Sequence, residues 1–382
     1  MIYSSIKKSF SKILAIIMGC SMIMSGSACA KTPKTTHNLT ITEFNSPVSL
    51  VAYPVEAYLS AGPEVLVTDF LLKETTRFDK GEPVVFSYDL ESEVPADVEA
   101  VVLEFSFQKD FSVIEKIDAF TADEQLAVYN LQTGRHYYFR LSVQLSDGQT
   151  VSKTGEFETA SGVRMISLDG ASNVRDIGGW KTESGKIIKQ GLLYRGGEID
   201  GGKNTGHPDF CLTKKGITQL RSLGIKTDFD LRSEENKVSQ YSVLGSDVKR
   251  EFYNAVHYEH VLDAENAETT RKIFSDLAKK DAYPVYLHCT HGVDRAGTTI
   301  FLLEALLGVA KEDLIRDYEL SAFYHNYQHV NRFLNNGGNI LELMEGLEAY
   351  EGETFSEKVI SFMLSIGVTA DELNSIRSIF LG

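Results

Sequence analysis

The stretch His288-Cys289-Thr290-His291-Gly292-Val293-Asp294-Arg295 decides how the second half of this 382-residue chain folds. The apolar run from Tyr283 to His288 predicts a strand before it, and the small and aliphatic residues from Ala296 to Val309 predict a helix after it. Five residues lie between the cysteine and the arginine, enough for a loop that wraps a dianionic phosphate. The spacing therefore predicts a strand, a phosphate-binding loop and a helix, in that order.

The residue types in this loop suit an anion. Backbone N–H groups that point into the loop and the N-terminus of the helix provide positive potential. Arg295 can hold two phosphoryl oxygens with its planar guanidinium, and Gly292 lets the backbone turn closely around them. The same field favours the thiolate form of Cys289, which can attack phosphorus. The predicted phosphate-binding residues are Cys289, Thr290, His291, Gly292, Val293, Asp294 and Arg295.

The loop resembles the signature His-Cys-x-x-Gly-x-x-Arg of the protein tyrosine phosphatase superfamily, whose four fixed positions all match. Three further stretches, in the same order along the chain, resemble the atypical bacterial tyrosine and lipid phosphatases, a group that contains secreted phosphatases of mycobacteria and Listeria. These stretches are Asn173-Val-Arg175-Asp176-Ile-Gly178-Gly179, Gly191-Leu-Leu-Tyr-Arg195-Gly-Gly and Asp230-Leu231-Arg232-Ser233. The resemblance covers essentially all of 161–382. A rhodanese-type sulfurtransferase, whose cysteine loop is typically one residue shorter, is the weaker interpretation.

The resemblance implies an α/β cysteine-phosphatase fold, with a central, mostly parallel sheet flanked by helices. It also implies a metal-independent phosphomonoesterase that acts on phosphotyrosine-like esters through a phosphocysteine intermediate. Some members take phosphoserine, phosphothreonine or phosphoinositides, so a phosphoinositide or inositol phosphate is the second substrate class. A degenerate phosphatase that only binds phosphorylated ligands is the alternative from a different functional class.

Two positions depart from the family pattern. Val293 stands where members usually carry a lysine linked to polyanionic lipid headgroups, so the rim of the loop is expected to lose a positive charge. Ala296 stands where a serine or threonine usually stabilises the departing thiolate, and Thr298 is the nearby hydroxyl that could take over this supporting role. We expect a phosphocysteine intermediate that forms readily and hydrolyses slowly.

The reaction needs an acid that protonates the leaving oxygen and later activates water. Asp294 lies inside the loop, where the family is thought to keep its acid, and is the first candidate. Asp230, at the carboxyl end of a predicted strand, is the alternative, although it could equally hold Arg232 in place. Asp228 is expected on the opposite face of that strand, and His288 is expected to support the loop by hydrogen bonds.

Other charged residues are expected to surround the site rather than to react. Arg175, Asp176 and Arg195 match family positions, and a structural ion-pair role suits them at least as well as direct binding. His325 and His329 lie one helical turn apart, but they lack a clear third ligand. No metal site and no cofactor are therefore predicted.

Residues 161–382 alternate strand-like and helical patterns, which is typical of an α/β layer fold. The second helical stretch of the tail is broken at Gly367 and restarts from an N-cap at Thr369, with Glu372 three residues on. The remaining predicted elements are a helix over Thr213–Leu223, a strand over Gly224–Arg232, and helical stretches over Lys311–Asn326 and Phe355–Phe380.

Residues 46–160 are predicted to be all-β, because short runs rich in Val, Phe and Tyr alternate with turn residues. The segment Leu131–Leu141 resembles the late strands of fibronectin type III domains, where a leucine, a turn glycine and a tyrosine pin a corner. The resemblance implies an immunoglobulin-like sandwich, whose partner the sequence leaves unknown. The clearest runs are Pro83–Leu90, Ala100–Gln108 and Tyr137–Leu145, the last joined to Val151–Thr159 by a predicted hairpin turn at Ser146-Asp147-Gly148-Gln149.

Residues 1–30 predict a secretory signal peptide, because lysines precede the apolar run Ile13–Met24 and small residues end at Ala30. A lipid anchor at Cys20 or Cys29 is the alternative, and 31–45 is predicted to be a polar linker. We therefore expect a secreted or cell-envelope bacterial protein that meets a membrane only through such an anchor.

The net charge of −15 disfavours nucleic acid and anionic membranes as partners. An anionic substrate must then be drawn by a local positive site, because the charge of the whole molecule repels it. The expected partner is a phosphorylated protein or a small phosphate ester.

Overall fold

The computed structural model describes residues 37–62, 64–71, 77–92, 97–201, 208–233, 239–324, 330 and 340–382. These residues form two compact units, whose segments alternate along the chain. The first unit contains residues up to Val48, Pro83–Val128 and Arg135–Thr159, and the second contains Ser49–Glu82, Tyr129–Gly134 and Ala160–Gly382. The predicted signal peptide, residues 31–36 of the predicted linker, and the pair His325 and His329 lie outside the described residues. Residues 37–41 of the predicted linker form a strand instead.

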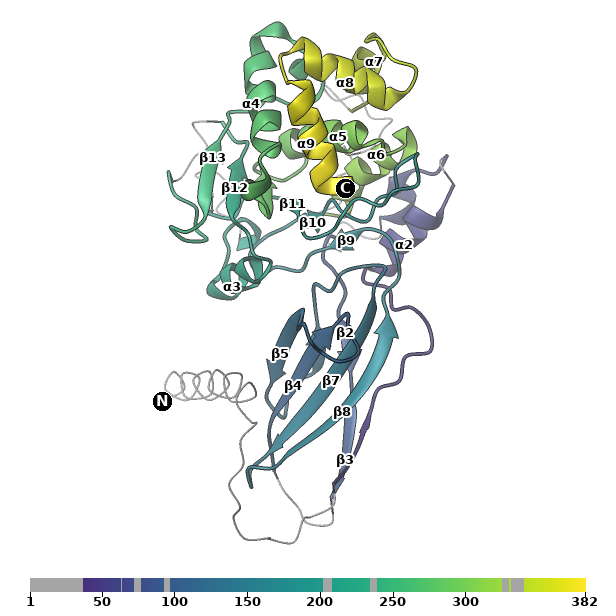
Figure 1. The fold of residues 1–382 in the computed structure, drawn as a ribbon, viewed down its shortest axis with the longest axis vertical. Helices are drawn as coiled ribbons and strands as arrows, with labels where there is room; N and C mark the ends of the chain where they lie inside the picture. Colours follow the sequence, from purple (N-terminus) through teal and green to yellow (C-terminus); the bar gives the residue numbers. More distant parts are fainter. Residues whose placement is uncertain are drawn as a thin grey trace. The chain divides into compact units, whose positions relative to one another are not determined.

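The described part of the first unit consists of antiparallel strands in three sheets (Figure 1). The largest sheet has the order β5-β4-β7-β8, while β1 pairs with β3 and β2 pairs with β6. Every second residue of β7 is buried, as expected for a strand with one face toward a core. The strands are β1 (His37–Ile41), β2 (Val84–Phe86), β3 (Tyr88–Ser92), β4 (Val98–Ser106), β5 (Lys116–Phe120), β6 (Leu126–Val128), β7 (His136–Leu145) and β8 (Thr150–Glu158).

The hairpin predicted between β7 and β8 is confirmed. The two strands pair without interruption from His136 opposite Glu158 to Gln144 opposite Thr150, and Gly148 in the turn has φ +84°. Aromatic rings pack between the strands, with centroid separations of 5.0 to 6.4 Å. The rings are those of Phe44, Phe86, Phe105, Tyr137, Phe139 and Phe157.

The second unit is built on a six-stranded sheet with the order β13-β12-β14-β11-β10-β9 (Figure 1). The pairs β13–β12, β12–β14 and β14–β11 are parallel, whereas β10 is antiparallel to both of its neighbours. Parallel pairing brings the carboxyl ends of these strands to one edge of the sheet, where α/β proteins gather their sites. The strands are β9 (Arg164–Met165), β10 (Arg175–Asp176), β11 (Leu193–Gly196), β12 (Thr227–Asp230), β13 (Lys249–Phe252) and β14 (Val285–His288).

The two faces of this sheet border separate cores. Val285 and Leu287 of β14 belong to a large cluster that includes residues from most of the helices, whereas Tyr286 belongs to a smaller cluster with Leu220. Helix α5 (Asp294–Leu307) is buried at every residue from Ala296 onward, which explains why small and aliphatic residues occur on all of its sides. The helices are α2 (Tyr53–Ser60), α3 (Lys214–Ser222), α4 (Ala267–Leu277), α5 (Asp294–Leu307), α6 (Lys311–Glu319), α7 (Ile340–Glu348), α8 (Phe355–Ser365) and α9 (Ala370–Leu381).

The predicted helix boundaries follow from capping. Thr213 caps α3 by accepting from the backbone N–H of Gly216, and Thr369 and Glu372 form the predicted capping box of α9. The stretch predicted as one helix from Lys311 is shorter than expected, because the chain tightens into a 3-10 helix at Leu320–Phe323 after α6 ends.

Residues 49–82 belong to the second unit, although the sequence pattern placed them in a β domain over 46–160. The physical reason is burial: Val55, Tyr58 and Val67 are fully enclosed and join the large core cluster of the second unit. Within the described ranges, no helix combines the length and the apolarity that a membrane crossing requires.

Candidate active site

The loop that carries Cys289 lies between the end of β14 at His288 and the start of α5 at Asp294. Cys289 is 2% exposed, whereas Arg295 and Asp294 are half-buried. Val293 is fully buried with the core residues, so its side chain lies away from solvent. The strand, loop and helix that the spacing predicts are therefore present.

Three consecutive carbonyl groups of the loop are held by donors from outside it. The backbone N–H of Glu198 donates to the carbonyl of Thr290 at 3.1 Å. The Asn173 amide Nδ2 donates to the carbonyl of His291 at 3.2 Å. Arg195 Nη2 donates to the carbonyl of Gly292 at 2.9 Å. Arg195 lies in β11, Glu198 follows β11 by two residues and Asn173 precedes β10 by two residues, so the backbone in and beside these two neighbouring strands fixes the orientation of the loop.

This arrangement determines where the loop amides point. In a planar trans peptide, the C=O and the next N–H point in opposite directions. Holding the carbonyls of residues 290–292 outward therefore turns the N–H groups of His291, Gly292 and Val293 toward the inside of the loop. Amides turned in this way beside the N-terminus of a helix are a combination suited to an anion. Arg295, in the first turn of α5, donates from Nη1 to the carbonyl of Leu231 at 3.5 Å.

Gly292 is required by this geometry. Its φ of +72° lies in the left-handed region, and a Cβ there would come within 2.4 Å of the carbonyl carbon of Gly196 and 2.7 Å of the nitrogen of Gly197. The loop therefore packs directly on the backbone that follows Arg195, the residue that holds the Gly292 carbonyl.

A buried ion-pair cluster holds Arg195 in place. Asp317 accepts from Arg195 Nη1 at 2.6 Å and from Arg175 Nε at 3.0 Å. Although burial opposes the charged form, the two arginines lower the pKa of Asp317. Burial and the charge of Arg175 lower the pKa of Arg195 to about 10, which leaves it protonated at neutral pH. Asp176 pairs instead with Arg164 at 2.9 Å.

Asp294 is bound by a tyrosine that the sequence did not single out. Tyr258 donates its hydroxyl proton to Asp294 Oδ1 at 2.5 Å and lies 2.8 Å from the hydroxyl of Tyr318. Burial, with Tyr318 and Asp294 nearby, raises the pKa of Tyr258, so the hydroxyl stays a donor. One carboxylate oxygen of Asp294 is thereby fixed.

Tyr258 itself is held in an unusual backbone conformation. Its φ is +55°, which is rare for a bulky residue, and its backbone N–H donates to Thr298 Oγ1 at 2.8 Å. Thr298 thus supports Tyr258, and its own O–H remains a donor. The preceding residue, His257, is close enough to Asp294 and Arg295 to feel their charges, and burial lowers its pKa.

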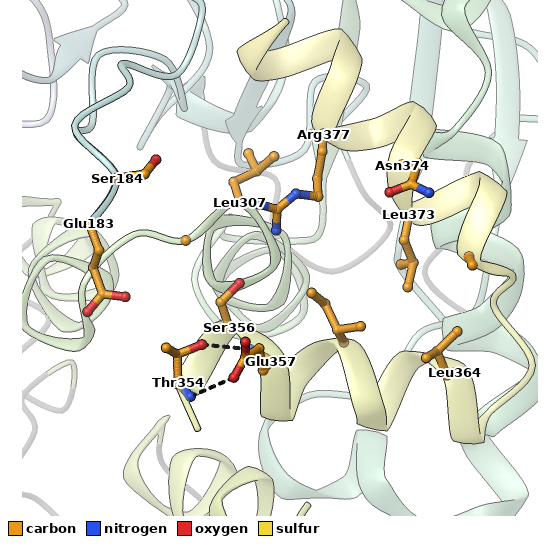
Figure 2. A pocket seen from close by; sticks show the side chains of 13 residues that line it. Glu183, Ser184, Leu307, Thr354, Ser356, Glu357, Leu364, Leu373, Asn374 and Arg377 are labelled. Atoms are coloured by element: carbon orange, nitrogen blue, oxygen red, sulfur yellow. Dashed lines mark hydrogen bonds between the residues drawn. The ribbon is translucent and has the colours of Figure 1, made fainter. Parts of the chain in front are cut away.

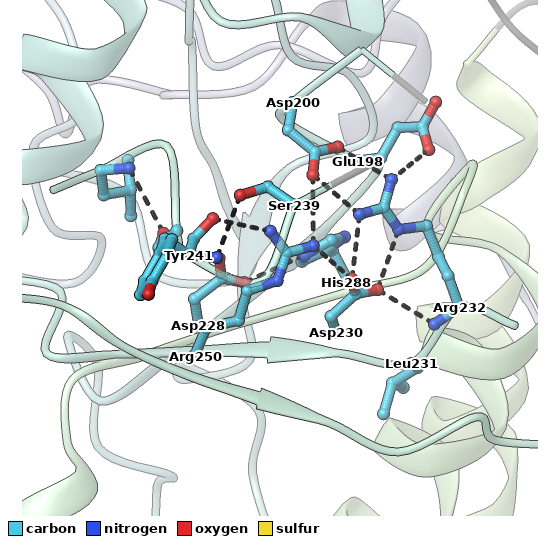
Figure 3. A network of polar contacts seen from close by, with 12 residues as sticks. Glu198, Asp200, Asp228, Asp230, Leu231, Arg232, Ser239, Tyr241, Arg250 and His288 are labelled. Atoms are coloured by element: carbon cyan, nitrogen blue, oxygen red, sulfur yellow. Dashed lines mark hydrogen bonds and ion pairs between the residues drawn. The ribbon is translucent and has the colours of Figure 1, made fainter. Parts of the chain in front are cut away.

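Asp230 belongs to a network of buried charges on one face of the sheet (Figure 3). Its two oxygens accept from Arg232 at 2.9 Å each, and Arg250 donates to one of them. Although burial opposes ionisation, His288, Arg232 and Arg250 lower the pKa of Asp230. Because both carboxylate oxygens of Asp230 already accept hydrogen bonds from arginines, Asp230 is better suited to positioning these arginines than to transferring a proton.

The prediction that Asp228 faces the opposite side of β12 is wrong. Asp228 Oδ1 lies 3.0 Å from His288 Nε2, and Asp230 is paired with His288 in the register of β12 and β14 (Figure 3). The physical reason is the two-residue period of a strand, which places residues 228 and 230 on the same face. Although burial opposes it, the two carboxylates raise the pKa of His288, which directly precedes Cys289.

The sequence predicted the cysteine loop but not most of the residues that contact it in the structure. Asn173 was part of a quoted stretch without a role, and Glu198, His257 and Tyr258 had no motif at all. The one signal in the sequence was that Asn173 lies two residues before Arg175, in a stretch that resembles the family. Within the residues described, no group of three or more His, Cys, Asp or Glu side chains could hold a metal ion.

A cavity of about 420 Å³ lies away from these residues (Figure 2). It is bounded by the C-terminal end of α5, by one side of α8 and of α9, and by the loop residues Glu183 and Ser184. Thr354 and Glu357 line it, but they satisfy each other as the capping box of α8. None of the predicted site residues lines this cavity.

Known proteins resemble the second unit. Residues 166–381 match the sequence profile described as the tyrosine phosphatase family. An inferred tyrosine-protein phosphatase of Cupriavidus necator is 26% identical over 201 residues, covering 46% of this chain and 69% of that protein. A tyrosine-protein phosphatase of Nostoc commune is 25% identical over 134 residues, covering 30% of this chain and 46% of that protein. The chain thus spans less than half the length of this second relative.

Replacing Gly292 with alanine should weaken the binding of inorganic phosphate by at least about tenfold, because the Cβ would displace the loop from Gly196. The matched control is Gly185→Ala, which also has positive φ (+85°) but meets nothing within 4 Å. Isothermal titration with phosphate measures both. Equal affinity in the two variants would contradict the packing described here.

Proposed function

Because the chain belongs to the tyrosine phosphatase family and is an enzyme of that type, we propose that it hydrolyses phosphotyrosine-like phosphate monoesters through a phosphocysteine intermediate at Cys289. The observation that supports this proposal is the set of three loop carbonyls bound by Glu198, Asn173 and Arg195, because it turns the amides of residues 291–293 to the other side of the loop, between Cys289 and Arg295 in the sequence. The proposal needs no metal or cofactor.

In the first step the thiolate of Cys289 attacks phosphorus, and the bond from phosphorus to the ester oxygen breaks. The loop amides and Arg295 stabilise the charge on the phosphoryl oxygens as it is transferred. Asp294 gives its proton to the leaving oxygen, while Tyr258 holds the carboxyl group by its other oxygen.

In the second step water attacks the phosphocysteine, and Asp294 takes the proton that the water loses. Inorganic phosphate leaves and the thiolate of Cys289 is restored. His288 directly precedes Cys289 and is held by Asp228, and the charges of Asp230 and Asp228 raise its pKa although burial opposes this. Asp230 serves as the anchor of Arg232 rather than as the acid, because both of its oxygens accept hydrogen bonds.

Phosphotyrosine-like esters are the first substrate class, and phosphoinositides or inositol phosphates are the second. Two observations support this order. Val293 is buried and uncharged where the resembling group carries lysine, so this position adds no positive charge for a second phosphate. The net charge of −15 also opposes polyanionic ligands.

Ala296 supports a second candidate function, binding of phosphorylated ligands with slow release. It is fully buried in the first turn of α5 and has no hydroxyl for the departing thiolate. Thr298, the predicted substitute, accepts from Tyr258, which still leaves its proton available for that role.

The proposal also includes export of the protein and a fibronectin-like fold for the first unit. The lysine-flanked apolar run within residues 1–30 supports secretion or attachment to the cell envelope, with a lipid anchor at Cys20 or Cys29 as the alternative. The hairpin of β7 and β8 and the aromatic cluster support a fibronectin-like sandwich. The quoted stretches support membership of the atypical bacterial tyrosine and lipid phosphatases.

The central experiment compares wild type with Cys289→Ser on a generic aryl phosphate between mildly acidic and neutral pH, with a chelator present. We expect turnover in the wild type and a loss of at least about 10³-fold in the variant, because serine is a far weaker nucleophile. Comparable rates in both proteins would overturn the cysteine mechanism.

Tyr258→Phe should slow hydrolysis of esters with poor leaving groups more than that of esters with good ones, because only the former need a well-placed acid. We expect kcat for phenyl phosphate to fall about 10- to 100-fold and kcat for a dinitrophenyl ester to fall less than about threefold. The control is Tyr283→Phe, which removes a buried hydroxyl bonded to the carbonyl of Leu277. A uniform loss on both esters would refute the positioning of Asp294 by Tyr258.

Ala296→Ser should speed the second step, because its hydroxyl can donate to the departing thiolate. Rapid mixing of wild type with an aryl phosphate should show a burst of about one product per enzyme followed by slower turnover, and the variant should show a smaller burst and faster turnover. Equal, burst-free turnover in both proteins would remove the case for a slow second step.

A further inference from the structure

Residues 49–82, which we call the strap, run along the second unit but lie outside the part of the chain that matches the family profile. The described residues of the strap are 49–62, 64–71 and 77–82. Hydrogen bonds join the strap to the rest of the second unit at several points. Arg316 donates to the carbonyl of Leu59 at 2.8 Å, and Phe78 donates its N–H to the carbonyl of Phe323 at 3.0 Å. The hydroxyl of Tyr58 bonds to Glu319.

One of these ties reaches toward the cysteine loop. Asp79 Oδ2 accepts from the backbone N–H of Asn173 at 2.6 Å, and Asp79 is 2% exposed. The side chain of the same Asn173 donates to the carbonyl of His291 and to Ser321 Oγ, both at 3.2 Å. The strap is therefore two hydrogen bonds away from the loop.

Asn173 needs such a partner. Its φ is +54°, in the left-handed region that asparagine tolerates better than most residues but that still costs free energy. A strained residue keeps its conformation only when its surroundings determine it several times over. Asp79 on the backbone N–H and Arg175 on the side-chain oxygen, at 2.8 Å, are two of these determinants.

Arg77 fixes Asp79 in turn. It forms a two-pronged pair with Asp79, at 3.0 Å to each oxygen, and donates to Ser172 Oγ at 2.8 Å, next to Asn173 in the sequence. It also bonds to Asp209. Although burial opposes it, these carboxylates raise the pKa of Arg77, so its guanidinium stays charged. The acceptor for Asn173 is thus held rigidly.

We propose that the strap is a working part of the active site, in which Asp79 is a positioning residue that holds Asn173 so that the loop amides face the phosphate. This inference rests on the proposed function, because it describes how the same loop is kept ready. The strap, which precedes most of the first unit in the sequence, is then a component of the phosphatase site in the second unit.

The test is a double-mutant cycle of Asp79→Ala and Asn173→Ala in the full chain. Two readouts are kcat and KM for an aryl phosphate and, in a Cys289→Ser background, the Kd of inorganic phosphate. Each single variant should lower kcat about tenfold and raise the phosphate Kd about tenfold. The double variant should lose no more than about twofold beyond either single variant, because both act through one contact with His291.

The control for a merely structural effect is Tyr58→Phe, which removes the hydroxyl that bonds to Glu319 and leaves the hydrogen bond from Asn173 to Asp79 in place. It should lower the thermal midpoint but keep kcat and the phosphate Kd within about twofold of wild type. Asp79→Asn, whose amide oxygen can still accept from Asn173, should recover kcat to within about threefold. If Asp79→Ala does not fold, Asp79→Asn replaces it in the cycle, and its smaller loss should vanish in the Asn173→Ala background.

Three results would each overturn the proposal. The first is a double variant whose loss of kcat is the product of the two single losses. The second is a loss of kcat for Tyr58→Phe as large as that for Asp79→Ala, and the third is wild-type kcat and phosphate Kd for Asp79→Ala. The phosphate Kd reports the loop even when no ester is hydrolysed. A failure of the cysteine mechanism would therefore appear as turnover that survives Cys289→Ser, separately from a failure of the strap.

Discussion

The hydrogen bond from Arg195 to the carbonyl of Gly292, with its two neighbours from Asn173 and Glu198, is the constraint on which the rest of the site depends. A loop of backbone amides binds an anion only if its carbonyls are kept out of the way. Left to itself, a short loop would turn some carbonyls inward and repel the phosphate. Because the three donors lie in or within two residues of the paired strands β10 and β11, the sheet helps to hold the loop in place.

This arrangement requires buried charge, which is costly unless it is fully paired. Arg195 can serve the loop because Asp317 pairs with it as well as with Arg175, and because the buried Glu304 also lies near enough to interact with its charge. Removing one member of such a cluster costs roughly 3–5 kcal/mol, so these residues hold the fold and the site together. The second network, around Asp230 and Arg232, does the same on the face below His288.

The sequence allowed the loop and its flanking elements to be predicted because these depend on local spacing. Cys289, Gly292 and Arg295 are fixed by a short motif, and the capping box at Thr369 is equally local. What could not be predicted depends on contacts across the chain. The bond from Tyr258 to Asp294 joins positions 36 residues apart, and that from Asp79 to Asn173 joins positions 94 apart.

Two further differences have simple physical causes. Asp228 was placed on the wrong face although strand periodicity alone would have placed it beside Asp230 and His288. The strap was placed in the β domain because composition does not reveal which core a segment joins; burial of Tyr58 and Val55 against the second unit decides it. The family profile begins at residue 166, so likeness to known proteins does not reveal the strap either.

The most direct measurement is a crystal structure of the protein with tungstate or phosphate bound. We expect anion oxygens about 2.7–3.2 Å from the amide nitrogens of His291, Gly292 and Val293, with Arg295 contacting two of them. The carbonyls of residues 290–292 should still be bound to Glu198, Asn173 and Arg195. An anion bound elsewhere, or a loop with those carbonyls turned toward the anion, would contradict the proposed role of the loop.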